Sequence, residues 1–163
     1  MASQHERFTY KQLCDYLASI AGKSKLINSF AERDHEEILE DIDQASELPA
    51  MVIDPPTCAK TDLHSSNPQD AWEIVFEILE YHSTKASTVS GKKQLISTCK
   101  YISDQVLSYL RRESQQNRLP GFDTADVSGA PIMYESDGYV GWECKIIISV
   151  PIDLSYKSDN WNE

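Results

Sequence analysis

Apolar residues recur at helical spacing through residues 92–117, a stretch without proline or glycine. They follow one another at steps of four, three, four and four. They are Leu95, Cys99, Ile102, Val106 and Leu110. Such steps place the apolar side chains on one face of an α-helix and the polar ones on the other. The pattern predicts a helix roughly 35–40 Å long, against which a sheet can pack.

The clearest strand pattern lies in residues 140–152, where apolar residues alternate with others, as in a strand with one face on a core. The apolar positions are Val140, Trp142, Cys144, Ile146, Ile148, Val150 and Ile152. Residues 127–134 predict a preceding strand, which Gly129 and Pro131 place at a sheet edge or a bulge. The Asp-Gly pair within residues 135–138 predicts a hairpin turn between the two strands.

Residues 71–82 fit two periods at once. As a strand, one face would carry Trp72, Ile74, Phe76 and Ile78. As a helix, one face would carry Ala71, Ile74, Val75 and Ile78. The aromatic and β-branched content favours a strand. Residues 51–53 predict a short strand, and the polar residues 57–69 predict a mobile loop.

The N-terminal part reads as helical. Residues 8–21 predict a first helix, with Thr9 as its N-cap and Gly22 as its stop. Residues 25–30 predict a short helical turn. The acidic residues 32–46 predict either a thin amphipathic helix or a solvated arm.

These elements predict an α+β fold class with the order α-α-β-β-α-β-β. A largely antiparallel β-sheet would pack on one long α-helix, with an N-terminal helical segment. We expect a single domain over residues 1–163. It would comprise the helical segment 8–46, a core of sheet and long helix in 50–152, and a tail in 153–163.

The charge of the chain changes which partners are expected. Formal net charge is −11 and the pI is about 4.7, which disfavours a general nucleic-acid surface and an anionic membrane. We find no signal peptide and no apolar run long enough to span a bilayer. These features predict a protein kept in a reducing cytosol.

The sequence carries no recognisable catalytic, cofactor or metal motif, so we expect neither catalysis nor a bound cofactor. Its cysteines form no Cys-x-x-Cys pair, which argues against a zinc or redox site. They are Cys14, Cys58, Cys99 and Cys144. All but Cys58 lie on apolar stripes and read as small buried hydrophobes.

Two groups of side chains could carry chemistry. His64 lies in one polar stretch with Asp62 and Cys58, and a nucleophile or metal site there would need partners from elsewhere in the chain. A solvated loop is the favoured interpretation. Glu73 and Glu77 could be paired carboxylates on one strand face, although exposed acids are the favoured interpretation.

Other residues suit contacts with proteins. Arg111 and Arg112 end the long helix, where cations suit the helix dipole or could meet an acidic neighbour. The polar residues 57–69 could form a binding arm. The tail contains Tyr156 and Trp161, residue types that anchor interfaces.

Three segments together resemble a known family. They are LPAMVIDP (48–55), KKQLISTCKYISDQVLSYLRRE (92–113) and YVGWECKIIISVPIDL (139–154). In this order they are similar to small virion proteins of tailed bacteriophages, of the tail-terminator or head–tail connector (neck ring) kind. They resemble above all the type encoded by phages and prophages of Bacteroidetes hosts.

The resemblance implies a cyclic homo-oligomer, a hexamer or dodecamer, at the head–tail junction of the virion or at the end of the tail tube. Its partners would be copies of itself and the portal, adaptor or tail-tube proteins, with DNA passing nearby without specific binding. No catalysis and no cofactor are implied. From the residues and this resemblance together, the residues that we assign to protein contacts are Asp62, His64, Arg111, Arg112, Pro131, Tyr156 and Trp161.

Two other classes of function remain open. One is an acidic cytosolic binding module, such as an inhibitor that mimics the charge of DNA, which predicts carboxylates spread over one face. The other is a small enzyme with an unfamiliar site, which predicts a deep pocket that holds titratable groups with perturbed pKa values.

Overall fold

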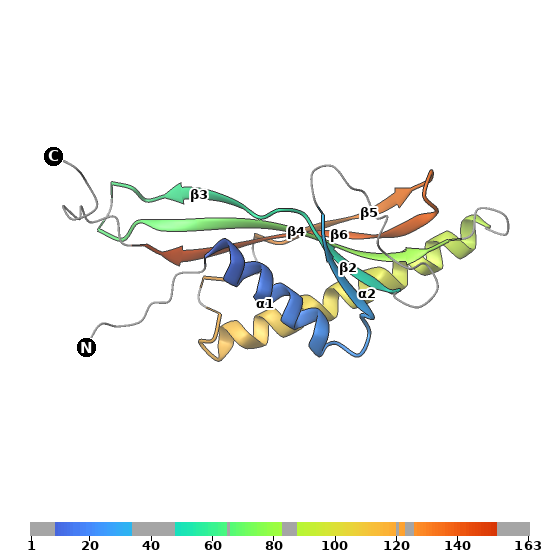
Figure 1. Ribbon diagram of the computed structural model, residues 1–163, viewed down its shortest axis with the longest axis horizontal. Coiled ribbons are helices and arrows are strands. Elements are labelled where there is room, and N and C mark those ends of the chain that lie inside the picture. Colours follow the sequence, from blue (N-terminus) through green and yellow to red (C-terminus); the bar gives the residue numbers. More distant parts are fainter. Residues whose placement is uncertain are drawn as a thin grey trace.

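A six-stranded, mostly antiparallel β-sheet with two α-helices makes an α+β fold in the computed structural model (Figure 1). The structure describes residues 9–33, 48–64, 66–82, 88–119, 121–122 and 126–152. In chain order the elements are α1 (Tyr10–Lys23), β1 (Ser29–Glu32), β2 (Ala50–Ile53), β3 (Thr57–Thr61), β4 (Gln69–Tyr81), α2 (Val89–Gln115), β5 (Ser128–Tyr134) and β6 (Tyr139–Pro151). The sheet order is β1-β2-β4-β6-β5, and β3 pairs with β4.

The centre of the sheet is the antiparallel pair β4 and β6, each thirteen residues long. They stay in register from Gln69 opposite Pro151 to Tyr81 opposite Tyr139. At about 3.3 Å per residue each strand extends roughly 40 Å, which makes the molecule elongated (Figure 1). The strand interpretation of residues 71–82 is confirmed, because β4 buries Ile74, Phe76 and Ile78 on one face.

Both helices cover the same face of the sheet (Figure 1). The apolar stripe of α2 is confirmed, with Cys99, Ile102, Val106 and Leu110 buried against the sheet. Leu95 is only half-buried. The helix α1 adds its own stripe to this core, made by Leu13, Cys14, Leu17, Ile20 and Ala21. The long helix therefore organises one layer, as its spacing predicts.

Capping sets where the helices begin. Thr9 caps α1 as predicted, in a capping box with Gln12. The predicted stop at Gly22 is wrong, because α1 continues to Lys23 and its C-cap is Ser24. The helix α2 begins at Val89, earlier than its apolar stripe, because the Thr88 side chain accepts a hydrogen bond from the backbone N–H of Gly91.

Two strands were missed by sequence. The helical turn predicted for residues 25–30 is wrong, since Ser29–Glu32 forms β1 and pairs in parallel with β2. The mobile loop predicted for residues 57–69 is also wrong in its first part. Thr57–Thr61 forms β3, whose side chains are mostly exposed and whose backbone pairs with β4. Backbone pairing holds an exposed edge strand such as β3 in place, so its sequence shows no apolar pattern.

The remaining elements agree with the prediction. The strand β5 lies at the border of the sheet, as Gly129 and Pro131 indicate. Gly138 closes the hairpin with a positive φ of 76°. Most of the predicted acidic helix or arm, from residue 34 on, and the tail 153–163 lie outside the described residues. Within the described part of the chain, no helix is long and apolar enough to cross a membrane.

Candidate functional site

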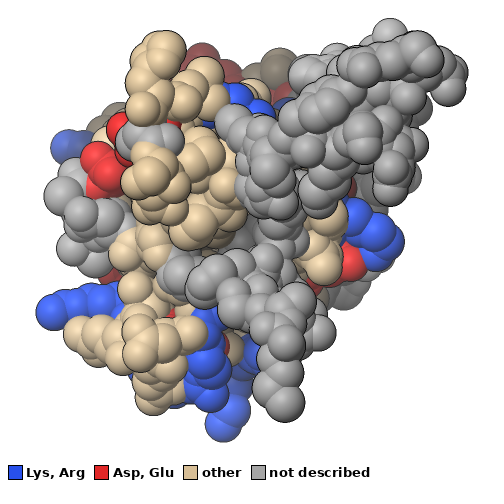
Figure 2. Space-filling view, turned by 90° about the vertical axis from the view of Figure 1, so that its left-hand side faces the viewer, with Lys and Arg blue, Asp and Glu red and all other residues tan. Residues whose placement is uncertain are grey.

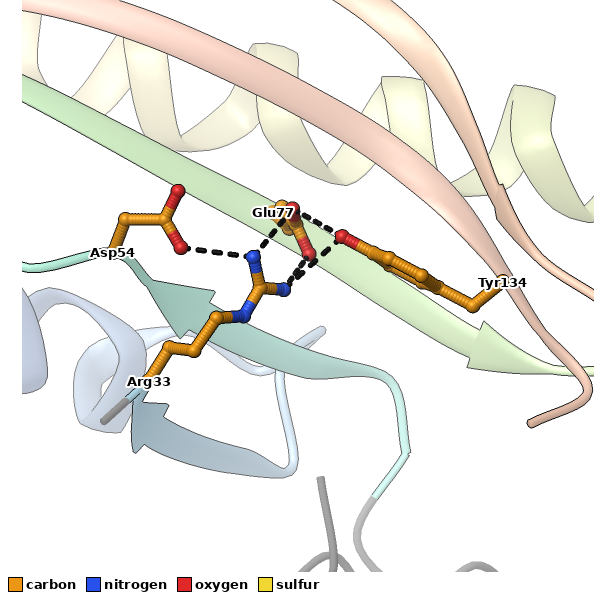
Figure 3. Close-up of polar contacts among 4 residues, drawn as sticks. All are labelled: Arg33, Asp54, Glu77 and Tyr134. Atoms are coloured by element: carbon orange, nitrogen blue, oxygen red, sulfur yellow. Dashed lines mark hydrogen bonds and ion pairs between the residues drawn. The ribbon is translucent and has the colours of Figure 1, made fainter. Parts of the chain in front are cut away.

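A cluster of four polar side chains lies on the face of the sheet that is turned away from α2 (Figure 3). The Arg33 guanidinium donates through Nη1 to Asp54 Oδ1 at 2.9 Å and to Glu77 Oε1 at 3.2 Å. Its Nη2 donates to Glu77 Oε2 at 2.5 Å and to the Tyr134 hydroxyl at 3.1 Å. The Tyr134 hydroxyl in turn donates to Glu77 Oε1 at 2.7 Å. We call these residues the central cluster.

Four strands position the central cluster. Arg33 directly follows β1 and Asp54 directly follows β2, whereas Glu77 lies in β4 and Tyr134 ends β5. The backbone fixes the first two, because Arg33 N–H donates to the Ile53 carbonyl at 2.8 Å and Asp54 N–H to the Val75 carbonyl at 3.0 Å. Since β6 separates β4 from β5, the Tyr134 side chain reaches across it.

The electrostatics of the cluster favour fixed charges. Burial alone would lower the pKa of Arg33, but the hydrogen bond and negative charge of Glu77 raise it above its ordinary value. Burial first, and then Glu77, raise the pKa of Tyr134 to about 12. Arg33 therefore stays charged and Tyr134 stays neutral near pH 7, so the cluster acts as a cross-link between strands and not as a proton-transfer pair.

Apolar side chains lie beside the central cluster on this face, and Tyr134 packs against them. A second, smaller core forms there from Ala50, Val52, Leu79 and Tyr139. Glu77 is only 2% exposed, so its charge depends on Arg33 for compensation. The predicted carboxylate pair is not formed as such, because Glu73 instead meets Lys145 Nζ at 2.7 Å. Each glutamate thus has its own cation.

The fold leaves the residues of the His64 group on the surface. Cys58 lies in β3, Asp62 follows that strand with a positive φ of 53°, and His64 lies in the next turn, all of them exposed. Among the described residues no three metal-ligating side chains come together. This segment turns the chain from β3 into β4.

The two ends of the elongated molecule carry different surfaces. At the end where α2 stops, Arg112 Nη2 lies 3.6 Å and Arg118 Nη2 3.1 Å from Glu113 Oε1. Arg112 also stacks over the Tyr109 ring, 5.0 Å from its centroid, and Lys23 Nζ lies 3.3 Å from the Tyr109 hydroxyl. We call this surface the basic end.

Lysine and arginine gather on the lower part of this end of the molecule (Figure 2). Arg111 is exposed beside the arginines at the end of α2. The turn between β3 and β4, which holds Asp62 and His64, lies further out along the long axis than the end of α2 (Figure 1). The N–H of the last described residue, Ile152, donates to the Pro68 carbonyl beside this turn at 2.9 Å. The fold thus places the end of α2 and the turn between β3 and β4 in the same half of the elongated molecule.

The opposite end contains a cavity of about 220 Å³, which we call the tip pocket. It lies between the first turns of α2 and the base of the β5–β6 hairpin. Its walls include His82, Lys92, Met133, Tyr134, Tyr139 and Val140. His82 follows β4, is 6% exposed, and donates its backbone N–H to the Gly138 carbonyl at 2.6 Å. Sequence reasoning missed this pocket because its walls come from segments far apart in the chain.

Three predicted contact residues remain. Pro131 is exposed on the border strand β5, apart from the basic end. Tyr156 and Trp161 lie outside the described residues. The sequence also did not reveal the central cluster, because a polar residue within or next to a strand, such as Glu77 or Arg33, reads equally well as exposed.

No protein-family model matches this sequence, and comparison with curated proteins finds no similar sequence. The function must therefore be argued from the surfaces just described.

Proposed function

We propose that this protein is a structural subunit of a tailed bacteriophage that forms a homo-oligomeric ring at the head–tail junction or at the end of the tail tube. It would act through protein–protein contacts and not by catalysis. The sequence resemblance to neck-ring proteins suggests this role. The structural observation that supports it best is that the two ends of the molecule carry different surfaces.

Unlike ends favour head-to-tail association. The basic end carries Arg111, Arg112 and Arg118, whereas the hairpin turn at the opposite end carries the exposed acids Glu135 and Asp137. When two different surfaces of one chain meet, the contact is repeated from copy to copy, and it closes into a ring if the rotation allows. Pairing of the arginines of one copy with Glu135 and Asp137 of the next would orient such copies.

The border strand β5 restricts how copies can meet. Four successive residues from Ser128 to Pro131 are exposed there, so the strand is open to contact. Proline has no N–H, and it is tolerated in an edge strand where that position faces away from the ladder. A continuous added strand would lack a donor at Pro131, so we expect side-chain contacts and not extension of the sheet.

The acidic binding module has less support. A mimic of DNA needs uncompensated carboxylates on one face, but on the helix-free face Glu73 and Glu77 are each paired with a cation. The charge that a basic partner would meet is therefore reduced on the helix-free face of the sheet.

The mass of the assembly tests the ring. The purified full chain should form one closed species of fixed copy number in native mass spectrometry and mass photometry at micromolar concentration, alone or with the portal or tube protein encoded beside it. Ring-shaped particles in electron micrographs would give the symmetry. A chain that stays monomeric under both conditions would contradict the proposal.

A further inference from the structure

The strand β3 leaves one border of the sheet open. One side of its backbone pairs with β4, and no described strand pairs with its other side. The side chains from Thr57 to Lys60 are exposed, and Thr61 is partly covered. A charged lysine is a common means of keeping other strands away from an edge, but the charge of Lys60 is already paired with Asp70. Such an open strand is a template to which a further strand can be added.

The other borders of the sheet are less suited to strand addition. Pro131 removes a backbone donor from β5, and β1 has only four residues, most of them partly buried. The strand β3 contains neither proline nor glycine. It runs parallel to the long axis of the molecule (Figure 1). Because ladder hydrogen bonds lie perpendicular to the strands, its open edge faces sideways and leaves both ends free for contacts with other copies.

The sequence of β3 matches itself when a second copy is turned around. In an antiparallel pair centred on Ala59, Thr57 lies opposite Thr61 of the other copy, and Cys58 lies opposite its Lys60. Opposed threonines form a favourable cross-strand pair, and no two charges of one sign face each other. Parallel pairing in register would instead set Lys60 beside Lys60, which is unfavourable. The strand therefore suits a two-fold contact with its own copy.

The small size of this contact decides when it can form. Pairing over the five residues of β3 buries less than the ~1,000 Å² of total surface that a stable interface needs. Free subunits should therefore pair only transiently through β3. A ring presents the same strand once in every subunit, so the contacts between two rings act together and their combined affinity is much higher.

We propose that β3 of one copy pairs with β3 of a second copy, antiparallel and about a two-fold axis at Ala59, and so joins two rings face to face. This isologous contact differs from the head-to-tail contact that closes a ring. Together the two contacts predict a closed double ring, as in a dodecamer built from two hexamers. The double ring rests on the proposed function, whereas the β3 contact between two copies does not.

Disulfide trapping tests the contact, because it also captures transient pairs. Ala59→Cys places a thiol on the two-fold axis, in a Cys58→Ser background because Cys58 is the exposed native thiol. The Cβ atoms of directly opposed residues lie ~4.5–5.5 Å apart, close to the spacing of a disulfide. Under mild oxidation this single variant should form disulfide-linked dimers. Ser128→Cys, at an exposed position of β5, is the control in the same background and should form them at least tenfold more slowly.

A second measurement tests the pairing of rings. Ala59→Asp sets two carboxylates against each other on the axis, so it should halve the copy number seen in native mass spectrometry, whereas Ala59→Thr should keep it. Circular dichroism checks that both variants keep their fold. No dimer from Ala59→Cys, or Ala59→Asp assemblies with the wild-type copy number, would overturn the β3 contact while leaving the ring intact. A chain that gives the Ala59→Cys dimer but whose wild type never closes into a ring would overturn the proposed function alone.

Discussion

At the residue scale, Glu77 is the position whose charge matters most for folding. Its carboxylate is 2% exposed and receives two hydrogen bonds from Arg33 and one from Tyr134. We expect Glu77→Gln to lower the free energy of unfolding by about 3 kcal/mol, because removal of one partner leaves a buried charge with less compensation. The midpoint of urea unfolding measures this change.

Glu73 is a matched control for Glu77. It lies on the same strand and the same face, and its ion pair with Lys145 is 42% exposed on both sides. We expect Glu73→Gln to cost less than ~1 kcal/mol, since exposed pairs contribute little. Equal costs for both variants would show that burial of the central cluster does not govern its contribution.

Titration of buried groups predicts loss of stability at alkaline pH. Burial raises the pKa of Tyr134 to about 12 and that of Cys99 to about 12, from ordinary values of 10 and 9. The folded chain therefore keeps protons that the unfolded chain releases. The resulting stabilisation is complete below the ordinary pKa values and is lost as pH rises through the raised ones. The urea midpoint should fall progressively between about pH 9 and 12, whereas a flat profile would contradict the shifts.

At the scale of elements, two glycines predict opposite effects of the same substitution. Gly22 lies inside α1 and an added Cβ would meet nothing within 4 Å. Gly22→Ala should raise stability by about 0.5–1 kcal/mol, because alanine favours helix. Gly141 lies in β6, where a Cβ would come within 2.1 Å of the Ile78 carbonyl oxygen.

We expect Gly141→Ala to lower stability by ~2 kcal/mol or more, because neighbouring backbone in β4 has to shift. Thermal unfolding of the two variants next to the wild type measures both effects. A stabilised Gly141→Ala would mean that β4 and β6 are less closely packed than described.

Elements that bury one face against the core could be predicted from the sequence. Elements without a buried face could not be predicted. The helix α2 and the strands β4 and β6 carry their apolar residues at the periods of their structures, so their type was foreseeable. The strands β1 and β3 are short and only partly covered, and backbone pairing with a neighbour forms them. Such pairing depends on the tertiary arrangement, which local composition does not encode.

At the scale of the whole molecule, charge on the basic end should tune association. Arg111 is exposed and belongs to no ion pair among the described residues. We expect Arg111→Gln to raise the assembly concentration a few-fold, and more so in dilute salt than at 0.5 M, because exposed charges are screened. Lys100→Gln removes the same charge from the middle of α2 and should change it less. An effect independent of salt would argue against an electrostatic contact.

The surfaces of the molecule were only partly foreseeable. Arg111, Arg112, Asp62 and His64 could be selected because charge and loop composition are visible in sequence. The tip pocket and the central cluster each combine segments more than fifty residues apart. That these residues lie together becomes visible only once the register of β4, β5 and β6 is known.

The central cluster also has a mechanical consequence. One guanidinium joins β1 and β2 to β4, and Tyr134 extends the link to β5, so strands from both borders of the sheet meet at one point. We therefore expect a pulling force on the first border strand to be shared with the middle of the sheet. The release of Arg33 from its two carboxylates should then contribute, with the β1–β2 ladder, to the load at which the sheet begins to peel.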